Sequence, residues 1–373
     1  MSKQPSSFYL KEIGREYNDK MLAILKESPV ESEGLTICFD REPDIFLIPE
    51  LKSDYTQCVG FFKESELLGF AMISYQNVYV NKKPRTVMYF CNVYLKKMGR
   101  HHRFILRALK YFLKRTYQHA NIGYAIVMKG NKPAESYINR NESQFSSVAF
   151  SKSISLLDVK NIILTRRKKE SSRYKVRHAR NEDIDVIVTF LDEEYSRRLF
   201  APVISREKFI RNLRRRPGFG ISNYYIAEEN GEIAGVCAAW DTSALRQNRV
   251  LFYRKSFKLK KMLFSFLEFI FKFPPLPREG EAFRDVTITD YAIKERNPEV
   301  MEALLLKISN EYREKKYNIL IFGSYYEDPL LKASKKFFSK SVISNIVLFS
   351  KNKIDFEDGK IDTSKPYIDI ALL

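Results

Sequence analysis

The sequence has few of the residues that build metal centres and disulfide frameworks. Its 373 residues include four histidines, one tryptophan and four cysteines. The cysteines, Cys38, Cys58, Cys91 and Cys237, are widely spaced inside apolar runs, and no CxxC pair or Cys/His cluster has metal-ligand spacing. We therefore expect no metal site and four buried, reduced thiols, as in a cytoplasmic protein.

Long hydrophobic runs are also missing. The most apolar stretch, "MLFSFLEFIFKF" at 262–273, is too short to cross a bilayer and contains Glu268 and Lys272. The first twenty residues lack the apolar core of a signal peptide. We expect no transmembrane segment. The apolar stretch fits a buried helix better than a helix that docks weakly on a membrane surface.

The composition is otherwise that of a folded protein with a basic excess. Apolar residues make up 45% and aromatic residues 14% of the chain, and the length suggests about two domains. Lysine and arginine number 64 against 45 acidic residues, a formal net charge of +19. That excess favours anionic partners such as nucleotides, acyl-CoA, nucleic acid or a lipid surface. Because the basic residues are dispersed, general lysine enrichment explains the charge equally well.

Several elements occur twice in the same order. "CVGFFKESELLGFAMISY" and "YYIAEENGEIAGVCAAW" both read as strand, polar turn and strand, each with a glycine, Gly69 or Gly235, after the turn. Each is followed by a strand, a helix, another strand and a short helix. The charged run at 166–173 has the composition of a linker. These echoes predict a duplicated α/β domain: residues 1–163, a linker at 164–173, and residues 174–373.

The stretch "FCNVYLKKMGRHHRFILRALKYFLKR", residues 90–115, carries the strongest functional signal. It reads as a strand, a basic turn with the single glycine Gly99, and an amphipathic helix. The N-terminus of a helix binds phosphates through free N–H groups and the helix dipole. The turn is therefore either a phosphate site that uses cations in place of glycines or an ordinary strand-to-helix corner.

The order of elements resembles that of the GNAT superfamily of N-acetyltransferases, and the duplication resembles its tandem-domain members. The resemblance implies an α/β fold of two lobes, each a mixed, mostly antiparallel sheet flanked by helices. It also implies acetyl-CoA or another acyl-CoA as co-substrate and no metal. Alignment on Val93 puts Gly99 at the first glycine of the family's pyrophosphate turn, with His101 and Arg103 at later glycines. The residues it assigns to acyl-CoA are Val93, Tyr94, Leu95, Gly99, Arg100, His101, His102, Arg103 and Asn131.

The next family element matches "MKGNKPAESYINR". Asn131 and Ala134 keep the family's Asn-x-x-Ala spacing, and Tyr137 lies one residue before the usual tyrosine. In the family, that tyrosine protonates the departing CoA thiolate as a general acid. Tyr137 is therefore the candidate catalytic residue, although it can equally pack its helix against the sheet.

The C-terminal half departs further from the family pattern. Its matching turn, "AIKERNPEVMEALL", has no glycine and places Pro298 at a helix start. We expect this half to be a non-catalytic copy that shapes the acceptor side. Two further stretches are candidates for contact with an acceptor, or for local ion pairs at turns. They contribute Asp40, Arg41, Glu42, Trp240 and Asp241, and either Asp40 or Glu42 could be the general base.

Three functions fit these observations. The first is an acyl-CoA-dependent N-acyltransferase, in which a small-molecule or peptide amine attacks the thioester directly and the strand backbone polarises the carbonyl. The second is an aminoacyl-tRNA-dependent transferase of the tandem type, for which the net charge would suit tRNA. No contiguous basic face is evident, so a nucleic-acid partner is the less favoured reading. The third is a degenerate, non-catalytic binding protein.

Overall fold

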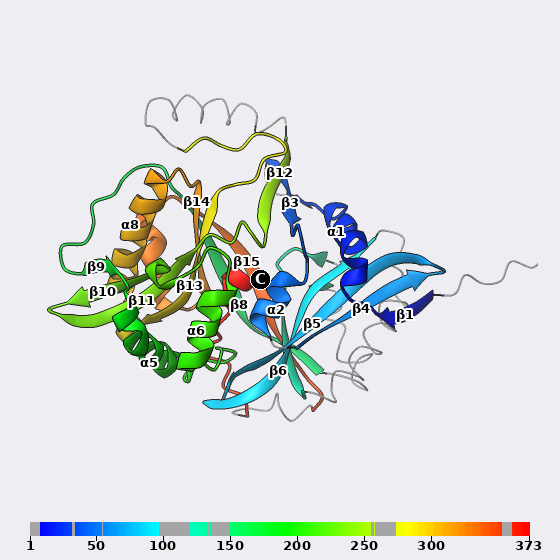
Figure 1. The fold of residues 1–373 in the computed structure, drawn as a ribbon, viewed down its shortest axis with the longest axis horizontal. Helices are drawn as coiled ribbons and strands as arrows, with labels where there is room; N and C mark the ends of the chain where they lie inside the picture. The colour runs from blue at the N-terminus through cyan, green and yellow to red at the C-terminus, as the bar shows by residue number, and fades with distance from the viewer. Residues whose placement is uncertain are drawn as a thin grey trace, which may run out of the picture.

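The computed structural model describes residues 8–31, 34–53, 55–96, 120–132, 134–135, 150–254, 257, 274–352 and 360–373. Within these residues the chain forms one large sheet of twelve strands, a small sheet of three strands, and helices that cover the large sheet (Figure 1). The mixed, mostly antiparallel architecture flanked by helices is the one that the sequence predicts.

The large sheet runs continuously through both halves of the sequence. In spatial order its strands are β1 (Phe8–Glu12), β4 (Tyr55–Lys63), β5 (Glu66–Val80), β6 (Lys83–Leu95), β7 (Ile122–Met128), β15 (Ser339–Ser350), β8 (Phe150–Ile163), β14 (Ile319–Tyr325), β13 (Asp285–Ile293), β11 (Glu232–Trp240), β10 (Tyr224–Glu229) and β9 (Lys175–His178). Counted inward from the two edges of the sheet, the halves match: each strand of the first half has its counterpart at the same distance from the opposite edge.

The centre of the sheet shows how the halves are joined. β8 belongs to the first half by sequence, yet it pairs with β14 of the second half. β15 belongs to the second half and pairs with β7 of the first. β8 and β15 also pair with each other along twelve residue pairs. The halves therefore exchange their last strands and form one sheet, where the sequence alone suggests two separate ones.

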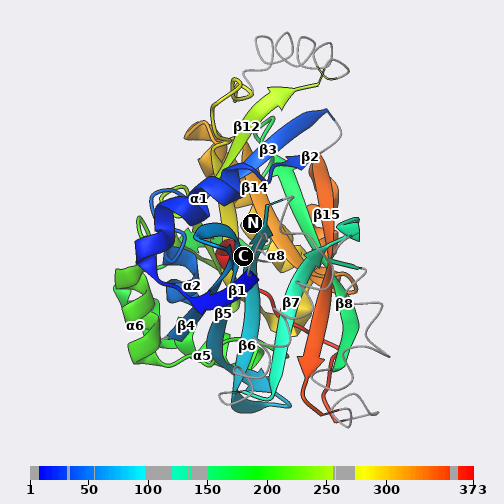
Figure 2. The same ribbon diagram turned by 90° about the vertical axis from the view of Figure 1, so that its right-hand side faces the viewer.

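A small sheet forms a second link between the halves. β3 (Leu35–Asp40) pairs on one side with β2 (Val30–Glu31) and on the other with β12 (Gln247–Tyr253), which comes from the C-terminal half. Figure 2 shows this sheet at one end of the molecule, beside the large one. The chain end also lies between the halves, near α2 in Figure 1.

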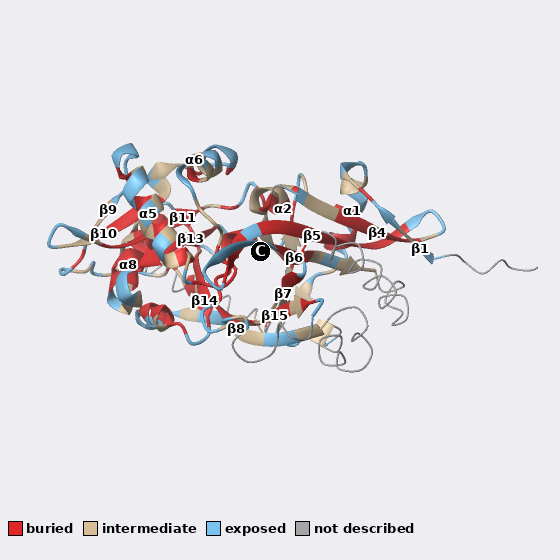
Figure 3. Cartoon of the chain, turned by 90° about the horizontal axis from the view of Figure 1, so that it is seen from below, coloured by how far each residue is buried: buried red, intermediate tan, exposed pale blue. Residues whose placement is uncertain are grey.

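The described helices follow amphipathic patterns and bury their apolar sides against the large sheet (Figure 3). They are α1 (Asn18–Lys26), α2 (Leu47–Lys52), α5 (Ile184–Tyr195), α6 (Arg206–Arg215) and α8 (Pro298–Glu314). The connection at 164–173 has no helix or strand, and it hydrogen-bonds to α8 through Lys168 and Asn310.

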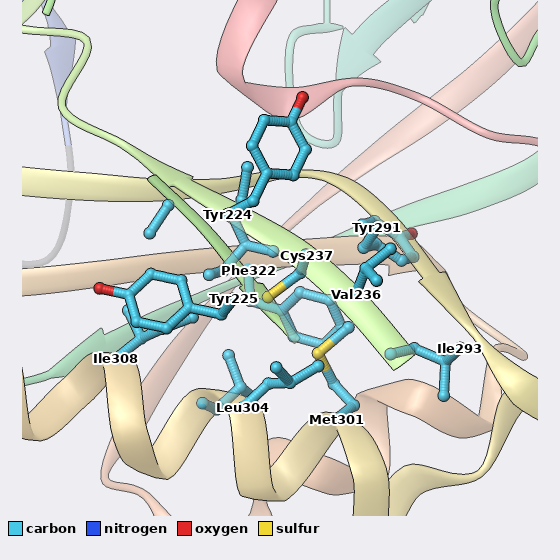
Figure 4. Close-up of a cluster of buried hydrophobic side chains, with 14 of the residues drawn as sticks. Tyr224, Tyr225, Val236, Cys237, Tyr291, Ile293, Met301, Leu304, Ile308 and Phe322 are labelled. Carbon is cyan, nitrogen blue, oxygen red and sulfur yellow. The ribbon is translucent and has the colours of Figure 1, made fainter. Parts of the chain in front are cut away.

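The core of the C-terminal half illustrates this packing (Figure 4). α8 begins at Pro298, with Asn297 capping the N–H of Glu299, and its Met301, Leu304 and Ile308 point at the strands. Because neighbouring side chains of a strand alternate between faces, Tyr225 points toward α8 and Tyr224 away from it. The four cysteines are all buried and free, as the sequence predicts.

Candidate functional site

A β-bulge interrupts the pairing of β5 with β6 in the N-terminal half. One residue of β5, Ala71, faces two residues of β6, Asn92 and Val93, because the register shifts between Phe70 and Met72. Asn92 has a φ of +49°, in the left-handed region that asparagine tolerates better than most residues. A bulge leaves one residue outside the hydrogen-bonded ladder and bends the strand. We call this feature the N-terminal bulge.

The C-terminal half contains the same feature between β11 and β13. Here Cys237 faces Asp290 and Tyr291, because the register shifts between Val236 and Ala238. Asp290 has a φ of +44°. The two residues that face a single residue of the neighbouring strand therefore lie at the same position in both halves. We call this feature the C-terminal bulge.

The two glycines that the sequence singles out mark the start of these bulges. Gly69 lies opposite Leu95, and Gly235 lies opposite Ile293. The strand on the other side of each glycine also shifts register there: β4 shifts against β5 next to Gly69, and β10 shifts against β11 next to Gly235. A β-carbon at Gly69 would lie 2.4 Å from the carbonyl oxygen of Tyr94. Glycine is therefore required for β5 to approach the bulged strand this closely.

Beyond each bulge, two parallel strands separate. β6 and β7 pair only from Met88↔Gly123 to Phe90↔Ala125, and β13 and β14 pair only from Asp285↔Ile319 to Thr287↔Ile321. Within the described residues these are the parallel pairs of the sheet. We call the diverging ends the N-terminal fork (91–95 and 126–128) and the C-terminal fork (288–293 and 322–325).

The C-terminal fork is closed by its own side chains. The hydroxyl of Tyr291 on β13 donates to Oγ of Ser324 on β14, at 3.0 Å. The buried guanidinium of Arg198 lies 5.6 Å from the ring of Tyr291 and 4.9 Å from that of Tyr367. Hydrogen bonds and packed rings therefore fill the space where these strands part.

Among the described residues, the N-terminal fork has no matching closure. The register of the two bulges places Val93 where the other half has Tyr291, and Val127 where it has Ser324. Val93 is 54% exposed and Tyr291 only 3%. Tyr94 and Leu95 are also partly accessible. The same backbone geometry is thus open in one half and filled in the other.

The start of α8 in the C-terminal half is unsuited to an anion. Pro298 has no N–H to offer, and the side chain of Asn297 already accepts from the N–H of Glu299. Glu299 adds a negative charge to the first turn and pairs with Arg173 at 2.8 Å. This helix start therefore offers an anion fewer free N–H groups and a less favourable charge than an ordinary helix N-terminus does.

Several predicted site residues can be placed. Val93, Tyr94 and Leu95 line the N-terminal fork. Asn131 accepts a hydrogen bond from the N–H of Ala134 at 3.3 Å, so its side chain serves as a helix cap. The predicted phosphate turn, Gly99 to Arg103 with Arg100, His101 and His102, lies outside the described residues, as do Tyr137 and the apolar stretch 262–273.

The acidic candidates for a general base are already engaged. Asp40 accepts from the N–H of Glu42 and pairs with Arg249 at 3.1 Å. Glu42 is exposed and pairs with Lys26. Among the described residues, neither carboxylate contacts the N-terminal fork, so the structure gives no support for either as the base. Arg41, between them, is buried, as Asp40 is, and its Nη2 donates to the main-chain oxygen of Leu373 at 2.7 Å.

Trp240 and Asp241 do not present an acceptor surface. Trp240 is fully buried in the C-terminal half, and its indole N–H donates to the carbonyl of Pro217 at 2.9 Å. Asp241 accepts from the hydroxyl of Tyr317 and from the N–H of Ser243, two residues along the chain. A position facing a cleft, one of the two possibilities that the sequence leaves open, does not fit these contacts: the ring belongs to the core, and the carboxylate stabilises a turn.

A group of three cations between the halves was not foreseen from the sequence. This cation cluster consists of Arg41, Lys52 and Arg246, which come from three separate segments and carry no shared motif. Burial is the main cause that lowers the pKa of each, to about 8 for Lys52 and about 10 for Arg246. Lys52 and Arg246 keep part of their side chains accessible, although protein atoms surround their charged groups.

No protein-family model and no curated protein matches the sequence. Solved structures do match. *Saccharomyces cerevisiae* N-myristoyltransferase with bound myristoyl-CoA superposes with a TM-score of 0.60 at 13% identity, covering 94% of this chain and 80% of that one. A GCN5-related N-acetyltransferase from *Anabaena variabilis* gives 0.51 at 9% identity, with 92% and 72% covered. One from *Sphaerobacter thermophilus* gives 0.51 at 10% identity, with 84% and 82% covered.

These matches confirm the predicted fold: over most of its length the chain folds like GCN5-related N-acetyltransferases and an N-myristoyltransferase. Among the described residues, no group of three or more histidine, cysteine, aspartate or glutamate side chains could hold a metal ion. In the same part of the chain, no helix is both long and apolar enough to cross a membrane.

Proposed function

We propose that this protein, which has the GNAT fold, is an N-acyltransferase that takes its acyl group from an acyl-CoA bound to the N-terminal half. In this proposal residues 1–163 and 174–373 are two copies of one unit, joined by residues 164–173. The first copy binds the donor, and the second shapes the acceptor side. The four buried free thiols support a reducing, cytoplasmic setting.

The difference between the two forks carries this proposal. Both halves keep the glycine, the bulge and the diverging strands, but among the described residues a tyrosine, a serine and a buried arginine fill the C-terminal fork alone. A bulge and fork that served packing alone would be filled in both halves. An accessible Val93 at the N-terminal bulge is what a bound thioester would need.

The chemistry assigned to this fork is direct acyl transfer. A main-chain N–H of the N-terminal bulge polarises the thioester carbonyl, because a bulged residue is free of the ladder. The neutral amine attacks the carbonyl carbon, the new C–N bond forms, and the C–S bond breaks. The departing CoA thiolate takes a proton, for which the resemblance offers Tyr137, and the amine loses one to solvent.

The resemblance also supplies the proposed phosphate contacts. Arg100, His102 and Arg103 would donate to the phosphates of CoA beside Gly99, in place of the family's further glycines. The acceptor would be a small molecule or a peptide with a free amine. Acetyl-CoA is the donor expected from the sequence, and the *S. cerevisiae* N-myristoyltransferase match makes longer acyl chains equally worth testing.

A matched pair of valine variants tests the assignment. Val93→Tyr installs in the open fork the residue that closes the other one, at a position 54% exposed. Val186→Tyr makes the same change on α5, where Val186 is 48% exposed and far along the sequence from the fork. The measurements are CoA release from acetyl-CoA through myristoyl-CoA with an amine panel, and calorimetric binding of each donor.

We expect the wild type and Val186→Tyr to bind one acyl-CoA per chain and to release CoA in an amine-dependent manner. Val93→Tyr should lose at least tenfold in donor affinity while keeping its melting temperature. Undiminished binding by Val93→Tyr would move the donor away from this fork. No binding of any acyl-CoA to the wild type would reject the proposed function.

A further inference from the structure

The cation cluster is gathered around the last residues of the chain. Nη2 of Arg41 donates to the main-chain oxygen of Leu373 at 2.7 Å, and Nη1 of Arg246 donates to the same oxygen at 3.0 Å. Nζ of Lys52 lies 3.4 Å from the main-chain oxygen of Leu372. Three positive charges thus share one small region between the two halves.

Some N–H donors of these cations have no hydrogen-bond partner among the described residues. Arg41 is only 8% exposed, yet its Nε and Nη1 have no hydrogen-bond partner among the described residues. The same is true of Nε of Arg246. Even if Leu373 carries a terminal carboxylate, that single charge balances only one of the three cations. A buried guanidinium with unused donors is costly unless an anion completes it.

The carboxylates of this region are committed elsewhere. Asp40 pairs with Arg249 at 3.1 Å. Asp285 accepts a hydrogen bond from Asn248 at 2.6 Å, and Asp369 accepts one from Thr289 at 2.9 Å. Asp369 also lies 3.8 Å from Arg216. These acids lower the electrostatic cost of the cluster from a distance, but none forms an ion pair with it in the described residues.

The cluster also adjoins the N-terminal fork. Nζ of Lys52 lies 3.9 Å from the ring centroid of Tyr89 on β6, three residues before the bulged Asn92. The charge of Arg41 interacts with the hydroxyls of Tyr89 and Tyr94, and Tyr94 belongs to the fork. A group bound by the cluster would therefore be held close to a thioester placed at the bulge.

Building on the proposed function, we infer that the acceptor is an amine that also carries an anionic oxygen group, a carboxylate or a phosphate, which the cation cluster binds. The cluster orients the acceptor so that its amine reaches the N-terminal bulge. It also selects against amines that have no anionic group, and it repels polyamines because they carry several positive charges. Nε and Nη1 of Arg41 offer N–H donors from which such a group can accept.

Direct binding tests the anion site without any acyl transfer. Succinate and inorganic phosphate are titrated against the full chain at constant ionic strength, by calorimetry and by thermal shift. The variants are Arg41→Met, Arg41→Lys and Arg246→Met. The control is Arg254→Met, which makes the same change at a guanidinium that pairs with Glu31 on the surface.

We expect at least one of the two anions to bind and to raise the melting temperature of the wild type and the control. Arg41→Met and Arg246→Met should lose about tenfold to a hundredfold in affinity, and Arg41→Lys should lie between. A response to succinate alone points to a carboxylate, and a response to phosphate alone to a phosphate. If neither anion stabilises the wild type beyond sodium chloride, the inference is wrong.

Pairs of acceptors with and without an anionic group then test whether the anion site acts in acyl transfer. CoA release is compared for glycylglycine against glycylglycinamide and for O-phosphoethanolamine against ethanolamine. We expect the anionic member to be preferred at least tenfold in kcat/KM, and Arg41→Met to abolish that preference. Equal rates for both members overturn the inference while leaving the proposed function intact. Anion binding without any acyl-CoA cleavage rejects the proposed function and leaves the anion site standing.

Discussion

Asn92 and Asp290 occupy the same position in the two halves, each at a left-handed φ inside a bulge that lies beside a glycine of the neighbouring strand of the sheet. Their surroundings differ. Asn92 is partly accessible and donates only a weak hydrogen bond to Sδ of Met72. Asp290 is buried and accepts from Arg216 and from the hydroxyl of Tyr224. The same backbone conformation is therefore partly accessible in one half and buried in the other.

The backbone conformation of Asn92 predicts a specific order of stabilities among variants. Asn92→Gly should leave the free energy of unfolding nearly unchanged, because glycine adopts a positive φ freely. Asn92→Val should lose about 1–2 kcal/mol, since a β-branched residue is strained there. Urea unfolding measures both. Equal stability of the two variants would mean that the bulge is not formed as described.

The two glycines should differ in their effect on donor binding. A β-carbon at Gly69 would meet the main-chain oxygen of Tyr94, whereas at Gly235 it would meet the side-chain ends of Ile293 and Val300. Gly69→Ala must therefore displace the bulged strand and weaken acyl-CoA binding. Gly235→Ala should cost about 1–3 kcal/mol of stability with binding unchanged. Calorimetric titration of both variants decides this, and a binding loss confined to Gly235→Ala would contradict it.

Two buried arginines should respond in opposite ways to the same substitution. Arg216 pairs with the buried Asp290, so Arg216→Met leaves an unpaired carboxylate and should cost about 3–5 kcal/mol. Arg41 has no carboxylate partner among the described residues, so Arg41→Met should leave the ligand-free protein as stable as before or more so. Chemical unfolding of both variants is the measurement. A similar large loss for both would show that Arg41 is a structural ion-pair residue.

Lys52 predicts a pH-dependent stability difference. Its folded-state pKa is lowered to about 8, below the value of about 10.5 in the unfolded chain. Between these values the unfolded state binds more protons, so the contribution of Lys52 to stability rises with pH across this window. Lys52→Met should be more stable than the wild type below about pH 8, and the difference should shrink toward pH 10. A difference that does not change with pH would show that Lys52 titrates normally.

Much of the fold follows from patterns within short segments. The repeated hairpins and their glycines, Gly69 and Gly235, predict the duplicated unit, because hairpins are specified by local turns and alternation. The exchange of β8 and β15 does not follow, since it depends on pairing between strands far apart in the sequence. The burial of Trp240 does not follow from the sequence for a related reason: it depends on how β11 packs against its neighbours in the fold.

The candidate site divides in the same way. The position of Val93, Tyr94 and Leu95 at the end of a strand could be predicted from the sequence before the expected turn. The bulge itself could not, because neither asparagine nor aspartate in a strand identifies a positive φ. The cation cluster was also hidden, since Arg41, Lys52 and Arg246 meet only through the tertiary fold. The sequence does single out Arg41, but as part of an acidic stretch that could contact the acceptor. The carboxylates of that stretch pair with residues outside the cluster.

Hydrogen–deuterium exchange with a non-cleavable thioether analogue of acyl-CoA tests most directly the claim that one fork binds the donor and its twin does not. We expect ligand-dependent protection at residues 90–96 and 122–132, and none at the matching residues 288–296 and 319–328. Protection confined to the C-terminal segments, equal protection of both forks, or no change at the N-terminal fork despite measured binding would contradict the account.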